Sequence, residues 1–532
     1  MKKKKTIIII VLTIIFALIL YYLTLPALNI HDINLWIYLL MVFIFYKLLS
    51  IFKINNLRDF IIVMNKPSKY KDISILIVGA LAVIIIIVNI AVSPLFNAKS
   101  YSKRINVDES NNFTEDVAEA DFQALPLLDK ASSQKLGDRV MGQMSELVSQ
   151  FTVSDLYTQI NYNNEIIRVT PLEYASFIKY FSNRSDGITG YITVDSVDGE
   201  AELIRLEKGM KYMPSAMFNE KLERKLRFSY PTEIFDEPNF EIDNEGNPYW
   251  IVPTVKYTGV SVRKEITGVV ILDPITGKSK KYDVKDVPTW VDHVYSADLI
   301  IEQIDNWGSY KNGFFNSIIG QKGVTISTEG YNYMVMNDDV YLYTGITSVL
   351  ADESNIGFIL CNMRTKETHF YSVAGAKEYS AMASAEGQVQ QMSYQATFPL
   401  LINLKGRPTY LMSLKDNAGL VKMYAFVDVE DYQKVVVTDS SLGIEKAASN
   451  YLSNVSLTPS EDNLTTKQIT INSINTAIIE GNTYYYLTDT NGQKYKAKIS
   501  VNSNKLPFLT TGSTITIKYS YETEVIDITT IE

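Results

Sequence analysis

Three long apolar stretches without charge occupy the first hundred residues of the chain. They cover Thr6–Ile30, Ile33–Tyr46 with a continuation past Lys47 to Phe52, and Ile73–Phe96. A hydrocarbon core about 30 Å thick requires about 20 helical residues, because each backbone N–H and C=O group must be satisfied within the segment. Lys47 lies near one end of the second stretch, where its stem can reach the interface. The sequence therefore predicts a three-span transmembrane anchor over residues 1–96.

Basic residues on either side of these spans predict their orientation, because short loops that remain in the cytoplasm are rich in Lys and Arg. Four lysines precede the first span and five basic residues separate the second from the third, whereas Leu25–Asp32 contains no Lys or Arg. Lys99, Lys103 and Arg104 oppose the rule but are outnumbered. We expect a multi-pass protein of the cell membrane, with a cytoplasmic N-terminus and with residues 97–532, the exterior, outside the cytoplasm.

The alternative for the N-terminus is a cleaved secretory signal. The apolar region of such a signal spans about 7–15 residues and ends in small residues. Here the apolar region is longer and ends near Tyr21, Tyr22 and Pro26. This favours an uncleaved anchor, and either alternative exports the remainder of the chain.

Charge and cysteine content limit the partners that the exterior can have. Cys361 is the only cysteine, which excludes an intramolecular disulfide. Residues 1–96 hold ten Lys/Arg and three Asp/Glu, a net +7, so the exterior carries −16 of a total charge of −9. Such a surface disfavours nucleic acid and anionic lipid as partners, although solubility alone is the simpler explanation of the charge.

Changes of composition divide the exterior into four segments. Residues 97–124 are rich in Ser, Asn, Asp and Glu and predict a linker, and residues 453–463 predict a second linker. Residues 125–452 predict one or more α+β domains. Within them we expect an amphipathic helix over Ser132–Phe151, a strand over Gln159–Val169 and a helix across Pro171–Phe181.

Four segments of the α+β region share one loose pattern. Each has a β-rich run, an Asp or Asn, two variable residues, a Thr or Asp, and a second β-rich run. The polar residue that opens the turn is Asp195, Asp273, Asn362 or Asp428. Such a side chain can accept hydrogen bonds from the turn's own backbone, and Gly199 and Gly277 suit positive φ at the reversal. Lys366 and Tyr432 take that place in the other two copies.

Helical patterns follow these predicted hairpins. They cover Ala216–Arg227, Val287–Trp307, Ala374–Gln391 and Leu442–Leu452. In addition, Gly246–Ile251 and Gly406–Leu411 share a glycine, a proline and an aromatic residue ahead of a strand. The sequence thus predicts repeated β-hairpin/helix units, with antiparallel sheets covered on one face.

The segments Gly190–Glu200 and Gly268–Lys278 resemble the second hairpin of PepSY-type domains, which are small helix-plus-hairpin modules of exported and membrane-anchored bacterial proteins. The whole chain, from its three spans through Gly419–Ala425, also resembles uncharacterised multi-pass membrane proteins of Gram-positive bacteria that are sometimes labelled CvpA-like or cell-shape proteins. The resemblance implies an envelope binding or regulatory module, because PepSY domains are associated with protease inhibition and other envelope roles.

Residues 464–532 differ in character from the rest, being rich in Thr, Tyr, Ile and Asn. Five strands are predicted, with Asp489–Gly492 as a hairpin turn between the second and third: Lys467–Ile479, Thr483–Thr488, Gln493–Val501, Ser513–Tyr519 and Glu524–Ile531. Five short strands in one small segment predict an OB-like or SH3-like barrel.

No catalytic, cofactor-binding or metal-binding residue is assigned from the sequence. Cys361 and His369 could meet across a hairpin, but a buried apolar role for the thiol is the simpler interpretation. Spaced Cys/His sets for zinc are absent. Trp290–Tyr295 is interpreted as an amphipathic helix, and Gly320–Gly323 as a surface turn without the features of a phosphate loop.

Two further groups have simple structural interpretations. The acidic pairs Asp338-Asp339 and Asp352-Glu353 lack the spacing of a calcium loop and are interpreted as solvated turns. Aromatic pairs, Tyr331/Tyr333 and Tyr341/Tyr343, could contact glycan but are better explained by cross-strand packing.

Two functions of different classes remain. The first is a non-catalytic, membrane-anchored binding or regulatory protein of the bacterial cell envelope, whose partners are the lipid bilayer and an envelope protein or cell-wall component. The second is an accessory subunit of a transport or secretion assembly, in which small or polar residues of the third span, Gly79, Ala80, Ala82 and Asn89, contact other membrane subunits.

Overall fold

Three long helices at the start of the chain have the length and composition to cross a membrane. In the computed structural model they are α1 (Lys2–Thr24), α2 (Ile33–Ile51) and α4 (Ile73–Val92). Their apolar windows are not buried inside the protein, so these surfaces are available to lipid. The helices agree with the three predicted stretches. The structure describes residues 2–51, 73–122, 125–336, 338–349, 354–454, 465–479, 482–519 and 525–531.

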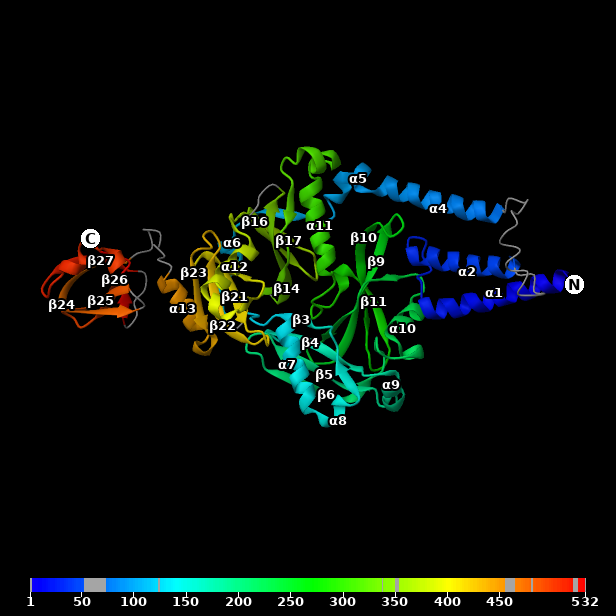
Figure 1. Cartoon of the computed structure of the whole chain (residues 1–532), viewed down its shortest axis with the longest axis horizontal. Coiled ribbons are helices and arrows are strands. Elements are labelled where there is room, and N and C mark those ends of the chain that lie inside the picture. Colours follow the sequence, from blue (N-terminus) through cyan, green and yellow to red (C-terminus); the bar gives the residue numbers. More distant parts are fainter. Residues whose placement is uncertain are drawn as a thin grey trace. The chain divides into compact units, whose positions relative to one another are not determined.

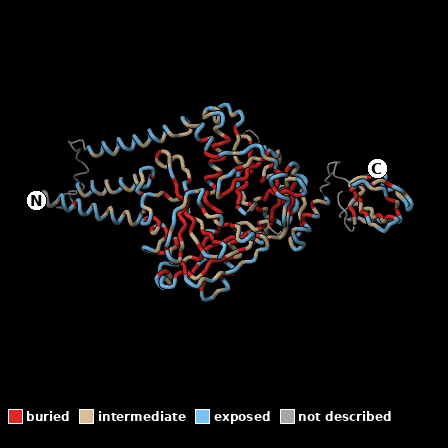
Figure 2. Tube along the Cα trace, turned by 180° about the vertical axis from the view of Figure 1, so that it is seen from behind, coloured by how far each residue is buried: buried red, intermediate tan, exposed pale blue. Residues whose placement is uncertain are grey.

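The first two of these helices form a pair, whereas the third lies apart from them. The rings of Phe16 and Phe45 stack with centroids 3.9 Å apart, and the Tyr38 hydroxyl donates to the Ala17 carbonyl at 3.1 Å. Helix α4 is separate from this pair in both views (Figures 1 and 2). A Cβ atom added at Gly79 would meet nothing within 4 Å. The small-residue side of α4 is therefore open.

Four antiparallel sheets follow, and all four have the same strand order. Each is a four-stranded meander whose second strand also pairs with a short preceding strand. The first sheet has β3 (Thr158–Tyr162), β4 (Glu165–Tyr174), β5 (Ile188–Asp195) and β6 (Ala201–Met210), with β2 (Phe151–Val153) as the short strand. The second has β8 (Asn239–Ile242), β9 (Pro248–Thr258), β10 (Arg263–Leu272) and β11 (Ser279–Asp283), with β7 (Ile234–Phe235).

The third and fourth sheets continue this order. The third has β13 (Asn332–Met336), β14 (Asp339–Ser348), β16 (Gly357–Asn362) and β17 (Thr368–Tyr371), with β12 (Thr325–Ser327), and β1 (Val107–Asn111) pairs parallel to β17. The fourth has β20 (Leu400–Leu404), β21 (Arg407–Lys415), β22 (Val421–Asp428) and β23 (Val435–Asp439), with β19 (Gln395–Ala396). A two-stranded sheet joins β15 (Ser354–Asn355) to β18 (Gly375–Ala376).

In each of these four sheets, one polar side chain stabilises the turn before the last strand of the meander. Asp195 Oδ1 accepts hydrogen bonds from the N–H groups of Val197 at 2.6 Å and Asp198 at 3.1 Å. Equivalent bonds are made by Asp273, Asn362 and Asp428 in the other three sheets. This side chain satisfies backbone donors that the reversal leaves without strand partners.

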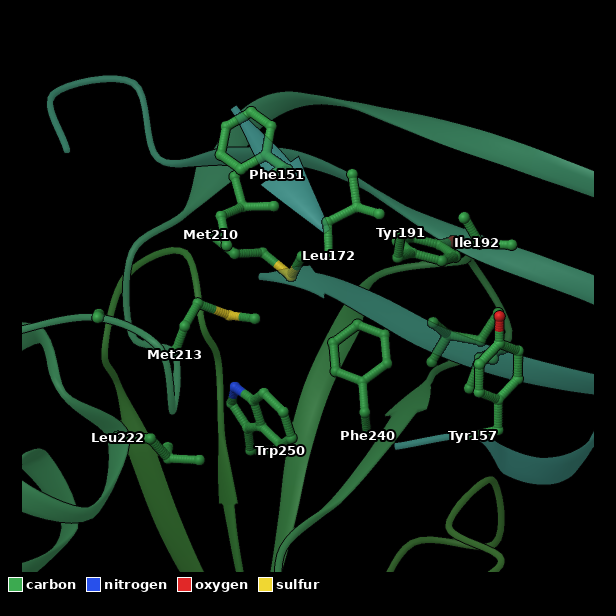
Figure 3. Close-up of a cluster of buried hydrophobic side chains, with 14 of the residues drawn as sticks. Phe151, Tyr157, Leu172, Tyr191, Ile192, Met210, Met213, Leu222, Phe240 and Trp250 are labelled. Atoms are coloured by element: carbon green, nitrogen blue, oxygen red, sulfur yellow. The ribbon is translucent and has the colours of Figure 1, made fainter. Parts of the chain in front are cut away.

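Neighbouring sheets share hydrophobic cores. Figure 3 shows the core between the first and second sheets, with Trp250 and Phe240 opposite Tyr191 and Met210. In β10, Val270 and Leu272 face this core while Val269 and Ile271 face the next core, shared with the third sheet. A strand buried on both faces must be apolar at every position, which explains this run.

The four sheets surround a common centre (Figure 1). A third core lies between the third and fourth sheets. The segment before the first sheet reaches back to the fourth, where Lys415 pairs with Asp129 at 2.6 Å and the Ser413 hydroxyl donates to the Leu127 carbonyl at 2.9 Å. The arrangement is like that of the blades of a small β-propeller.

Short helices cover the outside of the sheets. They are α5 (Pro94–Tyr101), α6 (Phe113–Asp116), α7 (Lys130–Gln143), α8 (Ser145–Val148), α9 (Phe177–Asn183), α10 (Leu222–Ser229), α11 (Ala297–Tyr310) and α12 (Glu378–Gln388). Helix α13 (Ile444–Asn454) starts at the boundary with a second compact unit of the chain. The predicted helix over Ser132–Phe151 is thus two helices, and its last residue, Phe151, begins β2.

Two predictions near the first sheet are wrong. The single strand expected over Gln159–Val169 is a hairpin of β3 and β4, because Asn163 and Asn164 take positive φ and reverse the chain. The helix expected across Pro171–Phe181 begins only at Phe177, after the Ser176 cap. Pro171 lies in β4 at the gap between its pairings with β3 and β2, where its missing N–H costs no ladder bond.

The linker predicted over residues 97–124 is folded wherever the structure describes it. Tyr101, Ile105, Phe113 and Val117 are buried, and β1 extends the third sheet. Arg104 pairs with Glu265 at 2.8 Å and with Glu302 at 2.5 Å. The segment has few apolar residues, but most of them are used in packing, which composition alone could not reveal.

The chain divides into two compact units at Ile444/Glu445, eight residues before the predicted boundary. The second unit has β24 (Thr465–Ile479), β25 (Asn482–Asp489), β26 (Lys494–Lys498), β27 (Thr514–Tyr519), β28 (Val525–Asp527) and β29 (Thr530–Ile531). The long β24 pairs with both β25 and β27, while the C-terminal segment pairs with β26 through β28 and with β27 through β29. Strands β28 and β29 thus close the sheet around the hydrophobic core of the second unit. Most of the predicted linker 453–463 lies outside the described residues.

Candidate functional site

Buried polar side chains gather where the first three sheets meet. We call the group formed by Gln159, Asn161, Glu241, Asp292 and His293 the acidic junction. Glu241 is fully buried, and Asp292 and His293 expose only 2% and 5% of their surfaces. Charged groups are rarely buried to this extent in a protein interior without a specific reason.

Glu241 lies in β8 between two core residues, and its carboxylate accepts hydrogen bonds from a segment of the chain that follows the second sheet. Its Oε2 accepts the backbone N–H of Asp292 at 2.8 Å, and its Oε1 accepts the N–H of His293 at 3.0 Å. These bonds replace the helical hydrogen bonds that Val287–Tyr295 would otherwise make. The helix predicted over Val287–Trp307 therefore begins only at Ala297.

Asp292 and His293 in turn hold β3 of the first sheet. The Asp292 carboxylate accepts the backbone N–H of Asn161 at 2.7 Å. His293 Nε2 lies 2.7 Å from the Gln159 carbonyl oxygen, which can only accept, so Nε2 carries the proton. The His293 ring also meets the Tyr333 ring edge-on at 5.4 Å. One short segment thus connects three sheets.

Burial controls the protonation of this junction. Desolvation raises the pKa of Glu241 to about 7, although the two backbone N–H donors oppose the shift. Desolvation and then the neighbouring Glu241 raise the pKa of Asp292 well above its usual range. Burial lowers the pKa of His293 to about 4, so its imidazole is neutral at pH 7. Glu241, Asp292 and His293 are enclosed where the sheets meet, with at most 5% of each residue exposed.

A second candidate site lies where the apolar helices meet the second sheet. The turn between β9 and β10, Gly259–Val262, contacts the end of α4, the connection between α1 and α2, and the first residue of α2. Asn89 in α4 exchanges two hydrogen bonds with the backbone of Val260, and the Ser261 N–H donates to the His31 carbonyl at 2.9 Å. We call this contact the span junction.

The connection between α1 and α2 strengthens the span junction. His31 Nδ1 lies 2.7 Å from the Gly259 carbonyl, Arg227 Nε donates to the Leu25 carbonyl at 3.0 Å, and the Leu28 N–H donates to the Pro231 carbonyl at 2.8 Å. Gly259 has φ of 78°, and a Cβ there would lie 2.7 Å from Val92 of α4. Only glycine allows so close an approach at this φ.

A hollow of about 400 Å³ opens beside the span junction. Its lining combines both signs of charge with hydroxyl and aromatic groups: Asn29, His31, Thr232, Glu233, Val255, Lys256, Tyr257, Thr267 and Lys281. Lys281 pairs with Glu233 at 2.7 Å. A hollow of this kind suits a polar ligand, and two of its lining residues come from the connection between α1 and α2.

Known proteins offer little guide to these sites. No family model matches the sequence, and no curated protein matches it. The chain matches a crystal structure of a point variant of an ACO/RPE65 chimera with a TM-score of 0.13 and 9% identity, over 71% of this chain and 65% of that chain. A TM-score this low does not indicate a shared fold. Function must therefore be argued from the residues themselves.

The structure does not bring Cys361 and His369 together as a catalytic pair. Cys361 is buried in β16, where its pairing partner across the strands is Thr368, while His369 pairs with Leu360. The Thr368 hydroxyl donates to Cys361 Sγ at 3.2 Å. Burial raises the pKa of the thiol to about 12, so it stays protonated and unreactive.

The acidic side chains of the turn before β14 are bonded to other residues of the chain. Asp339 is half of a bidentate pair with Arg364, at 2.8 Å and 2.7 Å, and Asp338 accepts a hydrogen bond from the Asn161 side chain. The pair Asp352-Glu353 lies outside the described residues. Among the residues that are described, no group of three His, Cys, Asp or Glu side chains is placed to hold a metal ion.

Tyr341 and Tyr343 are packed, whereas Tyr331 exposes 39% of its surface. Tyr341 and Tyr343 are buried in the third core, and the Tyr331 and Tyr333 rings contact each other at 5.6 Å.

Sequence reasoning missed Glu241, which is the centre of the acidic junction. The available signal was a glutamate between Phe240 and Ile242, in a short run whose neighbours are all buried.

Proposed function

We propose that this chain is a multi-pass membrane protein of the bacterial cell envelope whose exterior binds or regulates another envelope component. Its N-terminus would lie in the cytoplasm and residues 97–532 outside it. The partner would be an envelope protein or a cell-wall component, and the role would be non-catalytic. The three apolar helices and the distribution of Lys and Arg around them support this proposal.

The span junction is the observation that carries the proposal. A protein that is only tethered to a membrane needs a linker and no specific contact between linker and domain. Here Asn89, His31 and the carbonyl of Leu25 are all hydrogen-bonded to the second sheet or the segment before it. Such contacts hold the exterior in one orientation above the spans, which suits a protein that presents a binding surface at a fixed height.

Two features of the exterior support a binding role. The four side-chain-capped hairpins are compatible with the PepSY-like relationship that the sequence suggests, in which the role would be regulatory. In the C-terminal unit, the parallel pairing of β26 with β28 and the closure through β29 favour the OB-like alternative over the SH3-like one. Such barrels serve mainly as binding modules.

The alternative function is an accessory subunit of a transport or secretion assembly. The separation of α4 from α1 and α2 favours it, because the side of α4 that carries Gly79 has no partner within the described chain. Small residues allow close helix packing in a membrane. Another membrane protein could occupy this side.

Crosslinking in intact cells distinguishes the two functions. A simple exchange of the anchor would be ambiguous, because Asn29 and His31 of the anchor line the hollow. We would instead compare the native chain with a variant that changes Gly79, Ala80 and Ala82 to Leu and leaves the span junction intact. Recovery of the same partner by both chains supports the binding protein. Loss of the partner with the leucine variant supports the accessory subunit.

Impermeant thiol labelling tests the topology on which both functions depend. Because Cys361 is buried, the native chain is a nearly silent background. Lys208→Cys at an exposed position of β6 should react in intact cells, whereas Lys4→Cys should react only after the cells are opened. Labelling of Lys4→Cys in intact cells, with Lys208→Cys protected, would reverse the proposed orientation.

A further inference from the structure

Large apolar side chains are exposed on one side of the first two sheets. They come from α9, from the short 3₁₀ turn η2 (Phe218–Glu220) and from α10. We call them the aromatic patch, which consists of Phe177, Ile178, Phe181, Phe218 and Phe228. Between 44% and 71% of each residue is exposed. Soluble surfaces rarely expose large apolar groups together without a function.

The patch is a contiguous surface over α9 and η2. Phe177 and Phe181 contact each other with ring centroids 4.8 Å apart, and Phe181 lies 6.0 Å from Phe218. Tyr180 of the same helix points inward, where it is fully buried and donates to Glu220 at 2.7 Å. The apolar residues of α9 are therefore divided between an inward side that packs and an outward side that does not.

Helix α10 connects this surface to the outer end of α1. The Phe228 ring lies 6.3 Å from the rings of Tyr21 and Tyr22, and the Arg224 guanidinium lies 4.0 Å above the Tyr22 ring. Arg224 also donates to the carbonyls of Tyr22 and Phe218. The patch is thus joined to the residues that end the first span. Figure 1 shows α9 and α10 on the side from which α1 and α2 extend.

We propose that the aromatic patch inserts into the outer leaflet of the same bilayer that the three helices cross. The inference rests on the proposed function, because it needs α1 to be a membrane span. Aromatic and aliphatic side chains at the boundary of a span enter the headgroup and upper acyl region, to a depth of about 5–10 Å. Lys179 of α9 and Lys225 of α10 have charges that suit lipid phosphate, while Arg184 and Lys221, which flank these helices, pair with Glu220 at 3.6 Å and Glu223 at 3.8 Å.

The bilayer is favoured over a protein occupant by the continuity of the surface. The side chains of α1 that face lipid lead directly to Tyr21 and Tyr22, and from these to Phe228. A bilayer around α1 would extend to this ring without any new component. The chain would then contact the membrane at four places, namely its three spans and the aromatic patch.

Nitroxide quenching in phosphatidylcholine vesicles tests the inference with the full chain. Three variants with one added cysteine each, Ile178→Cys, Ile14→Cys and Leu442→Cys, would carry the same environment-sensitive fluorophore at that position, with the native Cys361 buried. Ile14 lies in α1 and reports the span itself. Leu442, also an exposed apolar residue, follows β23 in the fourth sheet, on the side away from the spans. One set of nitroxide lipids would carry the spin label near the headgroup, and a second set would carry it deep in the acyl chain, where it reports on Ile14 in the middle of α1. Iodide would probe access from water.

We expect the fluorophore at Ile178 to lose about half of its emission to the lipid nitroxide, at a depth typical of interfacial helices, and that at Leu442 to be unaffected. Quenching at Ile14 without quenching at Ile178 would overturn this inference and leave the proposed function intact. Absence of quenching at Ile14 would overturn both. Protection of Ile178 from iodide and from nitroxide together would mean that a protein covers the patch, which also overturns the inference.

Discussion

Asn89 of α4 and Val260 of the β9–β10 turn exchange two hydrogen bonds, with the Val260 N–H donating to Asn89 Oδ1 at 2.8 Å and Asn89 Nδ2 donating to the Val260 carbonyl at 3.2 Å. One amide side chain thereby satisfies both backbone groups of a residue that lies far away in the sequence. The pairing fixes the position of the second sheet relative to α4.

Removing this amide should loosen the span junction. Asn89→Ala leaves the Val260 N–H and carbonyl without their partner, at a cost of about 1–3 kcal/mol. We expect the amides of Val260 and Ser261 to exchange about tenfold faster or more in deuterium exchange of the chain in nanodiscs. Asn97→Ala is the control, because the Asn97 amide bonds only to carbonyls of the same helical segment. Equal exchange in both variants would show that the amide does not hold the junction.

Gly259→Ala should lower the Tm of the chain more than Gly406→Ala. These glycines have φ of 78° and 75°, so each substitution carries a backbone cost of about 1 kcal/mol or more. A Cβ at Gly406 meets nothing within 4 Å, whereas one at Gly259 lies 2.7 Å from Val92. The difference between the two Tm values measures the contact with α4. Identical losses would indicate that the turn can move away from α4 without cost.

Glu241→Gln should change how stability depends on pH. In the folded chain the pKa of Glu241 is raised above its usual value, to about 7. The contribution of this group to the free energy of unfolding is therefore fully present below pH 4.5 and is lost as pH rises to about 7. As pH rises from 5 to 7.5, we expect the free energy of unfolding of the variant to increase by up to about 3 kcal/mol relative to that of the native chain. Tm measurements in detergent across that range test this.

His293 supplies the opposite trend and remains in this variant. Its pKa is lowered to about 4. The contribution of His293 to the free energy of unfolding is therefore fully present above about pH 6.5 and is lost as pH falls toward 4. Glu245→Gln is the matched control, since Glu245 is exposed in the turn after β8. If Glu241→Gln and Glu245→Gln follow the native chain in parallel, Glu241 does not titrate in this range.

The thiol of Cys361 should be inert in the native chain. It is fully buried, and burial raises its pKa to about 12, so the reactive thiolate is scarce at neutral pH. We expect no maleimide labelling of the native chain at pH 7.5 within an hour and complete labelling after denaturation. Rapid native labelling would mean that the third sheet opens, and would also remove the silent background of the topology experiment.

Sequence patterns predicted the elements whose cause is local. The three long helices α1, α2 and α4 follow from their apolar composition, and the turns at Asp195 and Asp273 follow from a side chain that bonds to its own neighbours. The segment Val287–Tyr295 was predicted as a helix because its apolar spacing is compatible with one. Its actual conformation depends on Glu241 in another sheet, and no local pattern contains that information.

The candidate sites were less predictable for the same reason. The hollow combines Asn29 with residues of the second sheet, and the acidic junction combines residues of three sheets. Each residue taken alone is an ordinary polar residue in the sequence. Only the fold brings them together, and the strand order that does so depends on contacts between distant residues.

The two-sided burial of β10 restricts how this protein can be divided. Val269 and Ile271 serve one core while Val270 and Leu272 serve another, so cutting the chain on either side of the second sheet would uncover an apolar face. Fragments of residues 97–444 are therefore expected to aggregate. Because the segment before the first sheet also contacts the fourth sheet, the gain or loss of a sheet at any point would break contacts between neighbouring sheets. The four sheets should unfold as one cooperative body.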